Sequence, residues 1–293
     1  MHLTVDAGGP LHVDRLGSGR PMVLVHGLGA SHVHWLAVQQ ALALHHRVHI
    51  LDLPGFGLTP LAGRSPEVVP ASRFLAAYLS RLRTPSVLVG NSMGALLALL
   101  VAAGENRDLV SALVMVAPPA PRPLRTPIQR DLFLLFSAYA WPGLGELTRD
   151  LWVRLNGPEG MARNLLEVCT TSPGAVPPAV VEAAVQLAHL RPHDDEVHAF
   201  LGAYRSLWTY LLNGRRFDAL LRSVVAPTLV IRGTRDRLVP GMVGDRLVRV
   251  RPDWTHVLML DAGHMPQLDA PAEFSETVNS WLVGLEEGRQ AAG

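Results

Sequence analysis

The sequence of 293 residues predicts an α/β fold, built on a mostly parallel sheet that one helical insert interrupts. Two observations lead to this class. Short apolar runs rich in β-branched residues alternate with helix-length segments near both ends of the chain, as is typical of parallel strands joined by crossover helices. That alternation stops in the middle of the chain, where helical patterns broken by Pro and Gly take over. The length allows one large core to carry such an insert.

The first expected elements are two short antiparallel strands, at residues 3–6 and 11–16, because alternating apolar and polar residues flank the turn-forming Gly8, Gly9 and Pro10. Parallel strands and crossover helices follow. The strands are expected at residues 22–25, 48–51, 86–89 and 112–116, and the helices at residues 33–44, 66–83 and 92–103. The last of these helices is apolar on nearly every side, which predicts that it is buried against the sheet.

The central part of the chain, residues 120–225, is predicted to be a helical cap inserted into a core made of residues 1–119 and 226–293. The α/β pattern then resumes. Its elements are expected as a strand at residues 228–232, a helix at residues 242–250, a strand at residues 257–260 and a closing helix at residues 270–286. The small, aperiodic residues 288–293 are expected to be frayed.

Composition excludes several classes of protein. Hydrophobic residues make up 48% and charged residues 17% of the chain, which excludes extensive disorder. The net charge of +1 gives no electrostatic basis for binding nucleic acid or an anionic membrane. Cys169, the single cysteine, cannot form an intrachain disulfide or a thiolate cluster. With no signal peptide and no apolar run long enough to span a membrane, a cytoplasmic protein with a small-molecule partner is expected.

The strongest local motif is Gly90-Asn91-Ser92-Met93-Gly94, which lies between a predicted apolar strand and the predicted buried helix. A serine in this setting is a nucleophile elbow, a sharp strand-to-helix turn that exposes the hydroxyl. The two glycines fit this interpretation, because a side chain at position 90 or 94 would clash with closely packed backbone. Ser92 is therefore the predicted nucleophile.

A serine hydroxyl needs a histidine base and a carboxylate that orients the histidine. Asp236 follows the predicted strand at residues 228–232, and His264 follows the strand at residues 257–260, so both are expected at the carboxyl edge of the sheet. Position distinguishes His264 among the 13 histidines. Asp236 is preferred over three other acidic residues, which lie in a predicted helix, before a strand, or close to His264 in sequence: Asp245, Asp253 and Asp261.

A tetrahedral intermediate also needs hydrogen-bond donors for its oxyanion. The glycine-containing loop from His26 to Gly29 follows a predicted strand, and the backbone N–H of Leu28 is the first expected donor. The second is the backbone N–H of Met93, which follows the nucleophile and lies at the positive end of a helix dipole.

Together, these segments resemble the α/β-hydrolase superfamily with a helical cap, and the resemblance extends over nearly the whole chain. It rests on His26-Gly27-Leu28-Gly29, on Gly90-Asn91-Ser92-Met93-Gly94, on Asp236 and Gly263-His264, and on Asp52-Leu53-Pro54-Gly55-Phe56-Gly57, which is structural in that family. The resemblance implies a mostly parallel eight-stranded sheet, a Ser-His-Asp triad and no cofactor. Members that act on epoxides or haloalkanes use Asp as nucleophile, so Ser92 disfavours those two activities.

Two further groups of residues are histidines close together in sequence and the aromatic residues of the predicted cap. His32-x-His34 and His45-His46-x-x-His49 contain a common metal ligand, but no acidic or cysteine partner accompanies them and no metal site is expected. The aromatic residues of the cap are expected mainly to pack between helices, with some lining the roof of a hydrophobic pocket. They are Phe133, Phe136, Tyr139, Trp141, Trp152, Tyr204, Trp208 and Tyr210.

The sequence therefore predicts a serine hydrolase that cleaves small-to-medium hydrophobic carboxylic esters through an acyl-enzyme on Ser92. One alternative is a carbon–carbon bond hydrolase of the meta-cleavage type, whose elbow resembles this one, although Met265 replaces the aromatic residue that typically follows the histidine there. Another is a non-catalytic ligand receptor on the same scaffold. The sequence leaves thioesterase, lactonase and perhydrolase activities open, and it does not indicate the oligomeric state.

Overall fold

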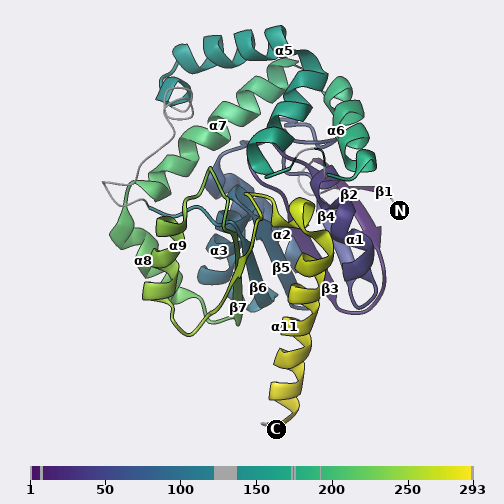
Figure 1. Ribbon diagram of the computed structural model, residues 1–293, viewed down its shortest axis with the longest axis vertical. Coiled ribbons are helices and arrows are strands. Elements are labelled where there is room, and N and C mark those ends of the chain that lie inside the picture. Colours follow the sequence, from purple (N-terminus) through teal and green to yellow (C-terminus); the bar gives the residue numbers. More distant parts are fainter. Residues whose placement is uncertain are drawn as a thin grey trace.

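The computed structural model describes residues 2–6, 9–121, 137–172, 174, 176–191 and 193–291. An eight-stranded sheet forms the centre of the fold (Figure 1), with strand order β1-β2-β4-β3-β5-β6-β7-β8. The strands are β1 (His2–Asp6), β2 (Pro10–Leu16), β3 (Pro21–Val25), β4 (Arg47–Leu51), β5 (Ser86–Asn91), β6 (Val110–Val116), β7 (Thr228–Gly233) and β8 (Thr255–Met259).

The first two strands pair antiparallel, and β2 also pairs antiparallel with β4. From β4 to β8 all neighbouring strands are parallel. Both the opening antiparallel pair and the mostly parallel sheet are therefore confirmed. Since all the parallel strands run in one direction, the loops that follow β3, β5, β7 and β8 meet at one edge of the sheet.

Helices cover both faces of the sheet. One layer contains α2 (Val68–Arg81), α3 (Met93–Ala103), α8 (Gly214–Ser223) and α9 (Gly241–Val250), and the other contains α1 (Leu36–Ala43) and α11 (Pro271–Ala291). Alternate residues of β3 supply the two cores: Val23 and Val25 pack in the first, and Met22 and Leu24 in the second. Successive side chains of a strand point to opposite faces of the sheet, so a strand that is apolar on both faces contributes to both cores.

Helix α3 is buried along almost its whole length, as its apolar sequence predicts. Short 3-10 helices, η1 (His32–Trp35) and η2 (Arg107–Leu109), precede α1 and β6. The predicted closing helix at residues 270–286 is confirmed as α11, which continues to Ala291, and a short helix that was not predicted, α10 (Pro266–Asp269), precedes it. The frayed tail predicted from Gly288 onward is therefore wrong up to Ala291, since the helix-favouring Glu286, Glu287 and Arg289 outweigh one glycine. Residues 292–293 lie outside the described ranges.

Between β6 and β7 the described residues form α5 (Leu144–Cys169), α6 (Pro178–Leu190), α7 (His193–Leu211) and α8. The first three gather over one end of the sheet, at the top of Figure 1. Helix α5 is kinked at Gly157, whose φ is 65°, immediately before Pro158. Two of these helices contribute to the core cluster that contains α3: Phe217 and Leu221 from α8, and Ala199, Ala203 and Tyr210 from α7.

In the ranges that the structure describes, no helix combines the length and the apolar character that a membrane span requires.

Candidate active site

Ser92 lies at the turn between β5 and α3, where the sequence predicts a nucleophile elbow. Its φ is 54° and its ψ is −117°, a left-handed conformation that is strained for a non-glycine residue. The neighbouring glycines make this turn possible. A Cβ at Gly90 would lie 2.3 Å from the carbonyl oxygen of Gly94, and a Cβ at Gly94 would lie 2.3 Å from that of Val25. The predicted close packing around both glycines is confirmed.

His264 and Asp236 are brought together from the loops that follow β8 and β7. The Nδ1 atom of His264 lies 2.8 Å from Oδ2 of Asp236, and both side chains are buried, with 4% and 3% of their surface exposed. The other carboxylate oxygen of Asp236 accepts hydrogen bonds from the backbone N–H groups of Leu238 and Val239, each at 2.8 Å. With Nδ1–H donating to Asp236, the Nε2 atom of His264 is left to exchange a proton with another group.

The three rival carboxylates pair with arginines. Asp261 lies 2.6 Å from Arg235, and Asp253 lies 2.7 Å from Arg251. Asp245 lies on α9, 4.0 Å from Arg232. Each of the three side chains is more than half exposed. The geometry therefore favours Asp236 as the partner of His264.

The loop after β3 packs directly against the elbow, since a Cβ at Gly27 would lie 3.1 Å from the Cβ of Ser92. His26 fixes this loop. Its Nδ1–H donates to the carbonyl of Gly27 over 2.8 Å, and its Nε2 accepts the N–H of Leu53 over 3.0 Å. Burial lowers the pKa of His26 to about 4, so the ring is neutral near pH 7 and keeps the lone pair that the second bond requires.

The two predicted oxyanion donors are the backbone N–H of Leu28, in the loop that packs against the elbow, and that of Met93, which follows Ser92 in the chain. Among the described residues, neither amide donates to another residue. The N–H of Ser92 itself is used, because it donates to the carbonyl of Val116 over 2.8 Å. Met93 begins α3, so its N–H is one of the helix-terminal amides that have no partner within the helix.

Two supports of the His264 loop were missed in the sequence. The side chain of Asn91 donates from Nδ2 to the carbonyl of His264 over 3.0 Å. The carboxylate of Asp269 accepts the N–H of Gly263 over 2.7 Å and that of Thr171 over 2.9 Å. The end of α5 takes part as well, because the N–H of Met265 donates to the carbonyl of Cys169 over 3.0 Å. No local pattern signals these bonds, since each joins residues that are distant in the chain or lie in irregular loops.

A cavity of about 1070 Å³ lies between the loops that follow β3, β5, β7 and β8 and the helices α5, α6 and α7. Ser92, His264 and Leu28 line its floor, and mostly apolar side chains complete its wall. Of the aromatic residues considered in the sequence, Tyr139, Trp152, Tyr204 and Trp208 line the cavity. Trp141 is 68% exposed and Tyr210 packs in the core, whereas Phe133 and Phe136 lie outside the described residues.

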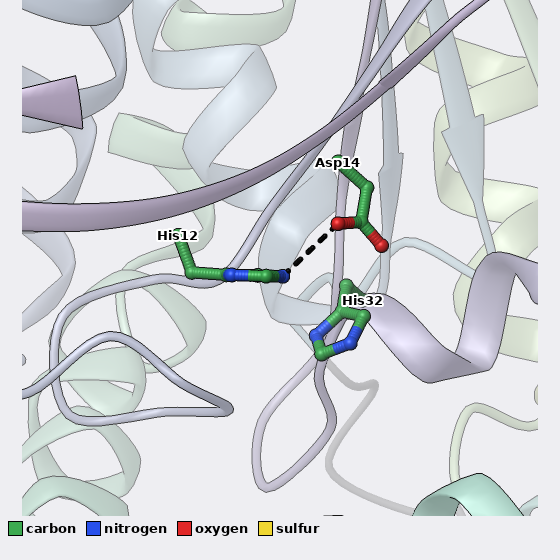
Figure 2. Close-up of side chains that lie close together, drawn as sticks. All are labelled: His12, Asp14 and His32. Carbon is green, nitrogen blue, oxygen red and sulfur yellow. Dashed lines mark ion pairs between the residues drawn. The ribbon is translucent and has the colours of Figure 1, made fainter. Parts of the chain in front are cut away.

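A second group of buried polar side chains connects β2 to η1 (Figure 2), where the ring centroids of His12 and His32 lie 4.6 Å apart. His12 Nε2 lies 3.1 Å from Asp14 Oδ1, and His32 Nδ1 lies 2.7 Å from Oδ2 of Asp52. Burial opposes the charged forms of His32 and Asp52. Their mutual hydrogen bond and attraction outweigh that cost, raising the pKa of His32 and lowering that of Asp52. Asp52 thereby anchors the start of η1.

His12, Asp14 and His32 could also hold a metal ion, since each offers one ligand atom and these atoms lie within 4.8 Å of one another. Imidazole and carboxylate suit zinc and other divalent cations. The grouping differs from the two weighed in the sequence and shares only His32 with them. Each carboxylate already faces a histidine nitrogen, Asp14 that of His12 and Asp52 that of His32. The absence of a metal from the reaction stays a prediction.

The fold and this site together define the class of protein, a hydrolase with a nucleophile elbow under a helical insert. The chain belongs to the Alpha/beta hydrolase family, whose sequence profile matches residues 22–277. It is 26% identical to the pimeloyl-[acyl-carrier protein] methyl ester esterase of Shewanella oneidensis, over 98% of this chain and 100% of that protein. The names of such relatives support a carboxylic ester hydrolase.

Solved structures show the same fold. A thermophilic esterase from Thermogutta terrifontis superposes with a TM-score of 0.73 at 23% identity, over 97% of this chain and 98% of that one. A meta-cleavage product hydrolase from Pseudomonas fluorescens gives a TM-score of 0.76 at 20% identity, with the same coverage. At these identities the likeness concerns the fold alone and does not separate ester from carbon–carbon bond cleavage.

Proposed function

We propose that this protein is a serine esterase in which Ser92, His264 and Asp236 form the catalytic triad. The observation that carries the proposal is the 2.8 Å bond between His264 and Asp236, in a cavity that Ser92 also lines. A buried carboxylate on Nδ1 leaves Nε2 as the base for a serine, which is the arrangement that nucleophilic acyl transfer requires.

In the proposed reaction, the Oγ atom of Ser92 attacks the ester carbonyl while its proton passes to Nε2 of His264. The N–H groups of Leu28 and Met93 bind the resulting oxyanion. The intermediate collapses to an acyl-enzyme, and the departing alcohol takes the proton from His264. Water then attacks the acyl group, giving a proton to His264, and the carboxylic acid leaves as Ser92 regains its proton.

The proposed substrates are small-to-medium esters with a hydrophobic acyl portion. The mostly apolar cavity supports this, because burial of an alkyl chain of the substrate stabilises its complex with the enzyme. The relatives named methyl ester esterases support a small alcohol portion. We propose residues 120–225 as the cap that closes this cavity, with the core formed by residues 1–119 and 226–293.

The proposal is tested with p-nitrophenyl esters of graded acyl length, alongside a dienone substrate for carbon–carbon bond cleavage. Ser92→Ala is expected to lower kcat by about four to six orders of magnitude. Ser137→Ala is the matched control, because Ser137 lines the same cavity and is expected to keep wild-type activity within a fewfold factor. A Ser92→Ala variant within tenfold of wild type would exclude Ser92 as the nucleophile.

Two further measurements distinguish this mechanism from its rivals. A fluorophosphonate probe is expected to label Ser92, whereas a ligand receptor would stay unlabelled. Treatment with EDTA is expected to leave ester hydrolysis unchanged. Loss of activity on chelation, restored by zinc, would contradict the serine mechanism and point to metal-bound water at a site such as His12, Asp14 and His32.

A further inference from the structure

Arg191 is a positively charged side chain in the wall of the cavity that the proposed reaction does not use. It lies between α6 and α7, is half-buried, and lines both the main cavity and a neighbouring cleft of about 280 Å³. Burial of a charge in a mostly apolar wall costs free energy unless another charge compensates it. The partners of Arg191 therefore indicate whether the fold itself accounts for this residue.

The other charged residues of the cavity wall offset one another. Arg149 on α5 forms a buried ion pair with Glu196 on α7, and Arg205 lies 2.7 Å from Glu146. Two further lining residues are exposed and opposite in charge: Arg237 and Glu167. Among the described residues that line the cavity, Arg191 therefore supplies the excess positive charge.

The guanidinium group of Arg191 is held in place but is not neutralised. Its Nη2 donates to the carbonyl of Gly55 over 3.0 Å, and its Cζ lies 5.9 Å from the centroid of the Phe56 ring. Within the described part of the chain, no carboxylate forms an ion pair with it, and Nε and Nη1 accept no printed partner while keeping accessible surface. Two donors of a fixed cation are therefore open to a bound molecule.

Electrostatics agree with this geometry. Burial lowers the pKa of the Arg191 guanidinium, because the attraction of nearby carboxylates, that of Glu196 foremost, offsets the cost of burial only in part. An arginine keeps its charge near neutral pH even so. A negative charge on a bound molecule would supply the compensation that the protein leaves incomplete.

Arg191 is also close to the proposed reaction centre. The Phe56 ring, over which its guanidinium lies, packs edge-on against the ring of His26, with centroids 5.6 Å apart. His26 in turn bonds to Gly27 in the loop that carries the first proposed oxyanion donor. Because Ser92 and Arg191 line the same cavity, an ester bound at Ser92 can extend a chain toward Arg191 without leaving it.

The charge of the site narrows the class of ligand. An ammonium group would be repelled by Arg191, and an alkyl chain would leave the cation desolvated and uncompensated. A carboxylate accepts charge-assisted hydrogen bonds from a guanidinium, and these are strengthened in a mostly apolar cavity. One excess positive charge matches a monoanion, which favours a carboxylate over a phosphate dianion.

We propose that Arg191 forms an anion subsite for a carboxylate at the far end of the acyl portion, so that the preferred substrates are monoesters of aliphatic dicarboxylic acids. This inference rests on the proposed esterase function, in which the alcohol portion is small. The mostly apolar wall suits the methylene chain between the ester and the carboxylate. Arg191 determines specificity and takes no part in bond cleavage.

The test compares monomethyl esters of dicarboxylic acids of graded length with analogues in which a primary carboxamide replaces the free carboxylate. The two groups have nearly the same shape and differ in charge. The ratio of kcat/KM for the carboxylate to that for the carboxamide is measured in a pH-stat. Wild type is expected to show a maximum of this ratio, above one, at a particular chain length. In Arg191→Gln that maximum is expected to fall by about tenfold or more.

Arg163→Gln is the matched control, because Arg163 is an exposed residue of α5 that pairs with Glu159 and does not line the cavity. It removes the same charge and is expected to leave the ratio unchanged. Circular dichroism verifies folding. Calorimetric titration of Ser92→Ala, in which Arg191 is intact, tests the subsite even where Arg191→Gln unfolds. The carboxylate is expected to bind about tenfold more tightly than the carboxamide.

Equal ratios in wild type and in folded Arg191→Gln would overturn the subsite, and so would equal affinities of Ser92→Ala for the two ligands. An equal loss in Arg163→Gln would also overturn it, because the preference would then arise from the overall charge. Failure of the esterase proposal looks different, since wild type would then hydrolyse neither series while the calorimetric preference for the carboxylate remained.

Discussion

The side chain of Asn91 holds the backbone of His264, with Nδ2 of Asn91 donating to the His264 carbonyl over 3.0 Å although the two residues are 173 positions apart. The same Nδ2 also lies 3.3 Å from the carbonyl of Val116 on the neighbouring strand. Asn91 is the last residue of β5 and precedes Ser92. One side chain thereby fixes the histidine loop relative to the strand that carries the elbow.

Replacing Asn91 is expected to displace His264 without removing any group that reacts. In Asn91→Ala, kcat for the best ester is expected to fall by about tenfold to a hundredfold, with little change in KM, because a shift of about 1 Å in a catalytic group has this effect. Steady-state kinetics measure the changes in kcat and in KM separately. A rise in KM with unchanged kcat would mean that Asn91 shapes the cavity and does not position the base.

Asp236, the proposed partner of His264, and Asp261, which is close to His264 in sequence, are expected to differ in their effect on activity. Asp236→Asn should lower kcat by about three to four orders of magnitude, since the amide stabilises neither the correct tautomer nor the imidazolium. Asp261→Asn is its matched control and should keep activity within threefold, because Asp261 is exposed and pairs with Arg235. The opposite pattern would assign the carboxylate role to Asp261.

Gly94 is expected to be intolerant of any side chain. In Gly94→Ala the new Cβ would meet the carbonyl oxygens of Val25 and His26 at 2.3 Å and 2.6 Å, both parts of a buried backbone. Overpacking of this kind is expected to lower the free energy of unfolding by about 3 kcal/mol or more. Urea denaturation measures the change.

Gly284→Ala is the control for that substitution, because Gly284 lies within α11 and a Cβ there meets nothing within 4 Å. It is expected to raise stability by about 0.5–1 kcal/mol, as alanine does inside a helix. Equal stability of the two variants would contradict the close packing at the elbow.

The pH dependence of stability is expected to depend on His26. Its pKa is about 4 in the folded protein and 6.5 in its ordinary state, so the unfolded chain binds a proton at higher pH than the folded protein does. Stability from this residue is therefore complete above pH 6.5 and is lost as pH falls toward 4. Between pH 7 and pH 5, wild type should lose about 2 kcal/mol more than His26→Gln, whose side chain cannot titrate.

Urea denaturation of both proteins at each pH measures this difference. Glutamine is the suitable replacement because its carbonyl can accept the N–H of Leu53, which His26 Nε2 accepts in the wild type. Parallel losses of stability in the two proteins would show that His26 titrates normally in the folded state.

Features that depend on neighbouring residues in the chain could be predicted from the sequence. The strands and the elbow follow from periodicity and from glycine spacing, and the bond between His264 and Asp236 follows from their positions after adjacent strands. The end of α11 could not be placed, because helix propensity and one glycine give opposing local signals.

Pairings between residues that are far apart in sequence could not be predicted. His12 and Asp14 stand in a strand that offers no sign of the η1 histidine next to them. Arg149 and Glu196 are separated by a whole helix and face each other only once α5 and α7 pack. In such cases the tertiary fold alone decides which charged side chains meet.

The bonds between the end of α5 and the His264 loop connect the helical layer mechanically to the proposed catalytic base. Besides the covalent connections after β6 and before β7, the carbonyl of Cys169 and the N–H of Thr171 tie the helical layer to Met265 and Asp269. A rigid outward swing of α5 would pull on the loop that carries the imidazole. A substrate therefore has to enter by movements that leave these hydrogen bonds intact. A molecule that binds outside the cavity and displaces α5 would slow proton transfer at His264.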